Sequence, residues 1–120
     1  EVRFTTEQAP GLFTSTQDYV WGSRQGSGAV IQGSFSSIIL PELDEVFGGT
    51  PQASCDSLTI GETARDARWP AEYANLSYYS YFLPPPPGSS RFSWRTWAIG
   101  IEYVGSRPSI VLLVHYQGEI

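Results

Sequence analysis

Short hydrophobic runs alternate along the chain with polar runs that are rich in Gly, Pro, Ser and Thr. The hydrophobic runs hold mainly the residues that favour strands, and the spacing of an amphipathic helix is almost absent. Turn residues recur about every 8–12 positions, which is typical of an antiparallel sandwich. The pattern predicts an all-β fold: an antiparallel, jelly-roll-like β-sandwich of about eight short strands with one short helical turn.

The first strong strand is expected over residues 29–40, with Gly33 as a bulge or kink. A polar loop, residues 22–28, precedes it. Shorter strands are expected in four places, which are residues 2–6, 12–16, 19–21 and 57–61.

The strand expected over residues 73–83 has two different faces. One face resembles a core and holds Ala74, Leu76, Tyr78, Ser80 and Phe82. The other face is aromatic and amphipathic, and it holds Tyr73, Asn75, Ser77, Tyr79 and Tyr81. The four prolines of residues 84–87 must end this strand, because proline cannot donate to a sheet ladder. We therefore expect residues 84–90, like residues 22–28, to form an exposed loop tip.

The last third of the chain contains two apolar registers. Phe92 and Trp94 share one parity, and the other is shared by Trp97, Ile99, Ile101 and Tyr103. A bulge or break is therefore expected near residues 95–96. A hairpin connection is expected at residues 104–109. Residues 110–114 are apolar without alternation, which predicts a central strand that is covered on both faces.

Residues 41–48 are expected to form the helical turn, because proline suits the first turn and glycine ends it. Glu42, Asp44 and Glu45 place three carboxylates in this turn and are weak candidates for calcium. Interaction of these acids with the positive end of the helix dipole explains them better. No metal or cofactor is therefore predicted.

Composition and charge narrow the class of protein. The 120 residues are 41% hydrophobic and 16% charged, which fits a single domain over residues 1–120. The net charge of −5 argues against nucleic-acid binding, and no apolar run is long enough to span a membrane. Cys55 is the only cysteine, so an internal disulfide is excluded and a reducing compartment is favoured. The absence of methionine predicts a piece of a longer polypeptide, with residues 1–10 as a lead-in from a preceding domain.

Catalytic chemistry finds little support. His115 is the only histidine, and no nucleophile elbow of the Gly-x-Ser-x-Gly type is present. Zinc is excluded because His115 and Cys55 are two ligands where about four are needed. Asn75 begins a glycosylation sequon, but it lies in an expected strand, so the match is interpreted as chance. We predict that the chain is not an enzyme.

The aromatic residues favour binding instead. Tyr and Trp are enriched at the centres of protein interfaces, where arginine is the best tolerated charged residue. The predicted interface comprises Trp69, Tyr79, Tyr81 and Arg95. An alternative is a carbohydrate-binding or lectin-like module of a larger secreted protein. Its stacking residues would be Tyr79, Tyr81, Trp94 and Trp97.

An acidic, Ser/Thr/Gly/Pro-rich β domain with a lead-in at residues 1–6, a proline-rich loop at 84–88 and a last strand at 110–116 resembles a known class. It is similar to the protruding domain of nodavirus or tombusvirus-like capsid proteins, in particular those of shrimp nodaviruses. The resemblance implies a spike domain on the virion surface, made in the host cytoplasm, that forms homodimers and contacts a host receptor or glycan. It also implies that the basic, RNA-binding part precedes this chain.

Overall fold

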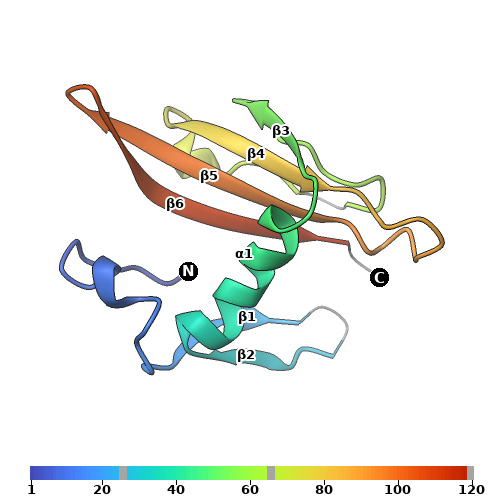
Figure 1. The fold of residues 1–120 in the computed structure, drawn as a ribbon, viewed down its shortest axis with the longest axis horizontal. Coiled ribbons are helices and arrows are strands. Elements are labelled where there is room, and N and C mark those ends of the chain that lie inside the picture. Colours follow the sequence, from blue (N-terminus) through green and yellow to red (C-terminus); the bar gives the residue numbers. More distant parts are fainter. Residues whose placement is uncertain (25–26, 65–66, 119–120) are drawn as a thin grey trace. The chain divides into compact units, whose positions relative to one another are not determined.

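A computed structural model describes residues 1–24, 27–64 and 67–118. The described chain is mostly β, as predicted, with six strands in two antiparallel sheets and one short α-helix (Figure 1). Contacts divide it into two compact units, Glu1–Gly48 and Gly49–Ile120. No helix in the described ranges is both long and apolar enough to cross a membrane.

The first unit contains a two-stranded hairpin. Strands β1 (Tyr19–Ser23) and β2 (Val30–Gly33) pair antiparallel, with a bulge between Val20 and Gly22. Part of the loop predicted at residues 22–28, residues 25–26, lies outside the described residues. The strands predicted at 2–6 and 12–16 are absent from this unit. At 12–16, backbone groups bond locally to a 3-10 helix (Ala9–Gly11) and are not free to form a ladder.

Aromatic rings pack together around the buried Phe35 of this unit. Tyr19 and Trp21 have ring centroids 5.6 Å apart, and Trp21 also contacts Phe35 at 6.2 Å. Phe4 lies against Tyr19 at 5.2 Å. The predicted lead-in, residues 1–10, is therefore joined to the hairpin through at least one large side chain.

The strand predicted over residues 29–40 is wrong in its second half. Strand β2 ends at Gly33, and Ser34 caps a helix: its Oγ accepts from the Ser37 backbone N–H at 3.2 Å, and Ser37 Oγ accepts from Ser34 N–H at 3.0 Å. This reciprocal pair is the arrangement of a capping box. A π-helical segment (Phe35–Ile39) then leads into helix α1 (Leu40–Phe47). The helical turn predicted at residues 41–48 is confirmed.

The second unit is built on a four-stranded antiparallel sheet in the order β3-β4-β5-β6 (Figure 1). Its strands are β3 (Gln52–Cys55), β4 (Ser77–Leu83), β5 (Arg95–Val104) and β6 (Arg107–Gln117). Strand β4 ends directly before the four prolines, and β5 and β6 form the predicted hairpin. Strand β6 is an edge strand, so the central position predicted for residues 110–114 is wrong. The apolar run arises because both faces of this strand carry apolar residues. Such a run does not indicate whether the strand is central or at the edge of the sheet.

One face of the sheet packs against residues 57–64, which we call the clasp segment. Ser80 and Thr96 lie on this face and are fully buried. Ser80 Oγ accepts from the Thr59 backbone N–H at 3.1 Å, and Thr96 Oγ1 donates to the Thr59 carbonyl at 2.8 Å. The strand predicted at residues 57–61 is absent. The Thr59 backbone bonds to buried hydroxyl groups and not to the backbone of a neighbouring strand.

Trp94 closes the same face. Its indole is 1% exposed, and its Nε1–H donates to Thr63 Oγ1 at 2.7 Å. A Cβ atom at Gly61 would overlap the indole ring, so only glycine fits at that position. The break predicted near residues 95–96 is replaced by the start of β5, which pairs there without a register shift. Trp94 precedes β5 and packs against the clasp segment, whereas Trp97 and Ile99 lie within β5 on the opposite face.

Candidate functional site

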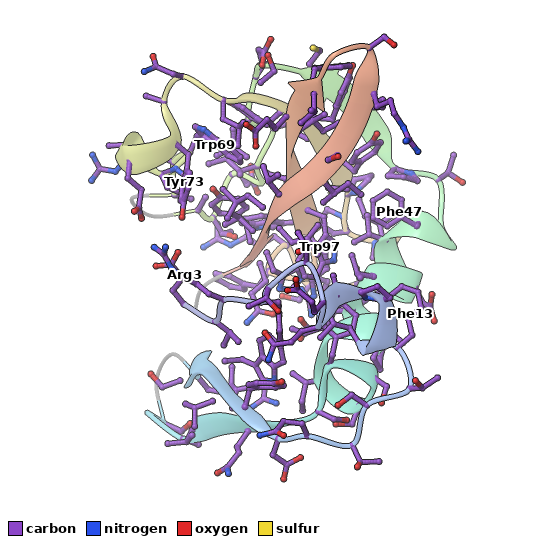
Figure 2. All side chains as sticks on the ribbon, turned by 90° about the vertical axis from the view of Figure 1, so that its left-hand side faces the viewer. Arg3, Phe13, Phe47, Trp69, Tyr73 and Trp97 are labelled. Atoms are coloured by element: carbon purple, nitrogen blue, oxygen red, sulfur yellow. The ribbon has the colours of Figure 1, made fainter. Side chains whose placement is uncertain are left out.

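Three of the four predicted interface residues lie on one face of the four-stranded sheet, and the fourth does not. The strand registers place Tyr79, Tyr81 and Arg95 on the face opposite the clasp segment. Trp69 lies on the clasp side, where its ring stacks on Tyr78 with centroids 4.0 Å apart. Its Nε1–H donates to the Tyr73 carbonyl at 2.9 Å, so Trp69 helps to hold the fold (Figure 2).

Tyr79 belongs to a cluster with Tyr81, Tyr103 and Cys55, which we call the tyrosine cluster. Tyr79 is hydrogen-bonded to Tyr103, and Cys55 faces Tyr79 directly across β3 and β4. Electrostatic interaction with Tyr103, and then with Cys55, raises the pKa of Tyr79 above its ordinary value. The phenol of Tyr79 is therefore a neutral hydrogen-bonding group at physiological pH.

The tip of the β5–β6 hairpin is apolar and exposed. Tyr103 is 57% exposed, Val104 69% and Ile110 65%. Ile110 and Tyr103 lie on the same sheet face as the tyrosine cluster. This face therefore presents a continuous aromatic and apolar surface to solvent at one end.

The other end of the same face is buried. Trp97 is 2% exposed, and its ring lies 4.6 Å from the His115 imidazole. Burial, and secondarily the charge of Arg95, lowers the pKa of His115 to about 4. Cys55 and His115 lie on opposite edge strands, with β4 and β5 between them, so the structure does not bring these two residues together.

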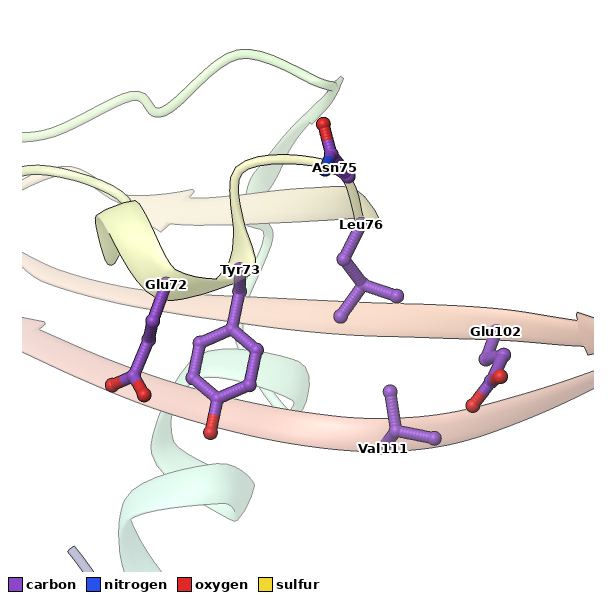
Figure 3. Close-up of a pocket in the computed structure, with 6 residues that line it drawn as sticks. All are labelled: Glu72, Tyr73, Asn75, Leu76, Glu102 and Val111. Carbon is purple, nitrogen blue, oxygen red and sulfur yellow. The ribbon is translucent and has the colours of Figure 1, made fainter.

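A hollow of about 390 Å³ opens on the clasp side of the sheet. It is lined by Glu72, Tyr73, Asn75, Leu76, Glu102 and Val111 (Figure 3). Sequence reasoning missed it, because the lining residues come from three segments that are distant in the chain. Asn75 lies in the turn before β4 and is exposed, so the prediction that it lies within a strand is wrong.

The remaining candidates have other positions. Glu42, Asp44 and Glu45 lie on α1, and no group of three or more His, Cys, Asp or Glu side chains suited to a metal is found among the described residues. Trp94 and Trp97, named for carbohydrate stacking, are both buried and present no ring face to a ligand. Tyr79 and Tyr81, the other two residues named for carbohydrate stacking, are half-buried and therefore more accessible.

Comparison of the chain with models of protein families, with characterised proteins and with solved structures finds no match. Function is therefore inferred from the surfaces of the chain itself.

Proposed function

We propose that this chain is a structural and recognition module that forms homodimers through the tyrosine cluster. The observation that carries the proposal is an aromatic cluster on one sheet face, where the half-buried Tyr79 and Tyr81 lie with the exposed Tyr103. Tyrosine is favoured at interface centres because it buries a large ring and still satisfies its hydroxyl group. A second copy of the same face would bury these rings and the neighbouring Ile110.

The role that agrees best with such a module is the one implied by the resemblance to capsid protruding domains. In that role the homodimer is a spike on the virion surface, and exposed loops contact a host receptor or glycan. The jelly-roll-like β-sandwich predicted from the sequence is also part of this proposal, whereas the described residues form six strands and not the eight predicted. Residues 84–90 supply an exposed loop: Ser89 Oγ donates to the Pro86 carbonyl, and Gly88 has a φ of 80°.

The dimer is tested by size-exclusion chromatography with light scattering over a range of concentrations. The double variant Tyr79→Ser/Tyr81→Ser is expected to shift the protein to the monomer while its circular dichroism is unchanged. Val20→Ser, a change of an exposed apolar residue on β1, is the matched control and should leave association intact. A wild-type chain that stays monomeric at high concentration would contradict the proposal, as would equal association by the double variant.

A further inference from the structure

A second surface, the hollow described above, is lined by apolar and acidic groups in a particular order. Leu76 and Val111 supply aliphatic side chains, and Tyr73 supplies a ring between them and Glu72. Figure 3 shows Glu72 at one end of this row and Glu102 at the other. None of the six lining residues is basic.

The wall of the hollow is held by packing and hydrogen bonds. Leu76 N–H donates to the Tyr73 carbonyl at 3.0 Å, and the same carbonyl accepts from Trp69 Nε1–H. Below the wall, a Cβ atom at Gly100 would come within 2.7 Å of Leu76 Cδ2 and 3.2 Å of Trp69 Cη2. A preformed hollow lowers the ordering cost that a ligand must overcome.

The charge pattern selects the ligand class. Two carboxylates repel phosphates and other anions, and their positions at opposite ends do not converge on a single metal ion. An aliphatic chain over Leu76 and Val111 would bury apolar surface away from water in the hollow. A cationic group at each end of the chain would pair with a carboxylate. The Tyr73 ring adds a surface that attracts ammonium groups.

We propose that this hollow binds an aliphatic diamine or polyamine, with its terminal ammonium groups at Glu72 and Glu102 and its methylene groups over Leu76 and Val111. The proposal is independent of dimer formation, since the tyrosine cluster lies on the opposite face. Because both carboxylates belong to an open site, binding is weak and depends on salt.

The test is a titration of the full chain with α,ω-diamines of increasing length and with spermidine, followed by NMR. The probes are the methyl signals of Leu76 and Val111. We expect one diamine length to bind about five-fold more tightly than the alkylamine of equal length, as expected for one additional ion pair. The matching neutral diol should bind more weakly still. Binding should be largely lost at about 1 M salt, where the screening length is about 3 Å.

Variants assign the two ends of the ligand. Glu72→Gln and Glu102→Gln should each reduce diamine affinity to that of the alkylamine, whereas Glu62→Gln, an exposed carboxylate of the clasp segment, should leave it unchanged. Equal loss with Glu62→Gln would mean non-specific charge attraction and would overturn the proposal. Tighter binding of the diol or of a neutral monosaccharide than of any diamine would overturn it in favour of a carbohydrate site.

Discussion

The two faces of the four-stranded sheet are built in opposite ways. On the clasp side, the fully buried hydroxyl groups of Ser80 and Thr96 hold the Thr59 backbone. On the other side, Trp97 is buried near one end of β5, and on this face the exposed fraction rises to 57% at Tyr103.

The two faces differ in their main kind of interaction: buried hydrogen bonds on the clasp side, and aromatic and apolar side chains on the other. Buried hydrogen bonds require fixed geometry, so those on the clasp side determine where the clasp segment packs on the sheet. Aromatic and apolar side chains tolerate variation in orientation and are suited to contact with a partner. The clasp side therefore carries the hydrogen bonds that help to specify the fold, and the exposed end of the other face is available for contact with a partner chain.

The largest effect is expected from filling the space at Gly61. Gly61→Ala places a methyl group in the Trp94 indole, so either the ring or the clasp segment must move. We expect a loss of about 3 kcal/mol in the free energy of unfolding, the upper range for overpacking. Urea denaturation measures it, and Gly11→Ala, where nothing lies within 4 Å of the new Cβ, is the control. Equal stability of the two variants would mean that the clasp side is loosely packed.

The next effect concerns His115 and pH. Its pKa is about 4 in the folded chain against 6.5 in the unfolded one, so between these values the unfolded state binds more protons. Stability is therefore complete above pH 6.5 and is lost as the pH falls toward 4. The full difference is on the order of 3 kcal/mol.

This pH dependence is checked by measuring urea unfolding of the wild type and of His115→Gln at several pH values. The variant should lose the part of the slope that lies between pH 4 and 6.5. Parallel curves for the two proteins would show that the imidazole is solvated in the folded state, and that the buried end of this face is more open than described.

A smaller effect is expected on removing one buried hydroxyl group. Thr96→Val keeps the side-chain shape but leaves the Thr59 carbonyl without its donor, which costs about 1–2 kcal/mol. The same substitution at the exposed Thr50 should be close to neutral. Hydrogen exchange of the Thr59 amide reports whether the clasp segment opens locally. An unchanged exchange rate would count against the role given to the hydroxyl groups.

The sequence predicted those features that depend on local chemistry. Pro84 ends β4 because proline has no N–H to donate, and the turn at Gly105 joins β5 to β6. Two features escaped prediction because they depend on pairing between distant residues. The alternation of Leu58 and Ile60 is typical of a strand, yet hydrogen bonds from side chains hold their segment in place of a ladder. The apolar run that ends at Val114 lies on an edge strand and not on a central one.

The candidate surfaces were predicted only in part. Alternation along β4 correctly separated Tyr79 and Tyr81 from Ser80 and Tyr78. Parity could not place Trp69, because it lies in a loop whose path is set by stacking on Tyr78. The hollow could not be predicted at all, since its two carboxylates are brought near each other only by the folded sheet.

The close packing of Gly61 against Trp94 also defines a sequence pattern with which relatives of this chain can be sought. The indole requires a glycine beneath it and a hydroxyl group at Thr63, which lies 31 positions before Trp94 in the chain. The buried Thr96 and Trp97 follow within three residues. The packing therefore justifies a Gly-x-Thr triplet followed at this interval by Trp-x-Thr-Trp as a pattern with which to search for relatives.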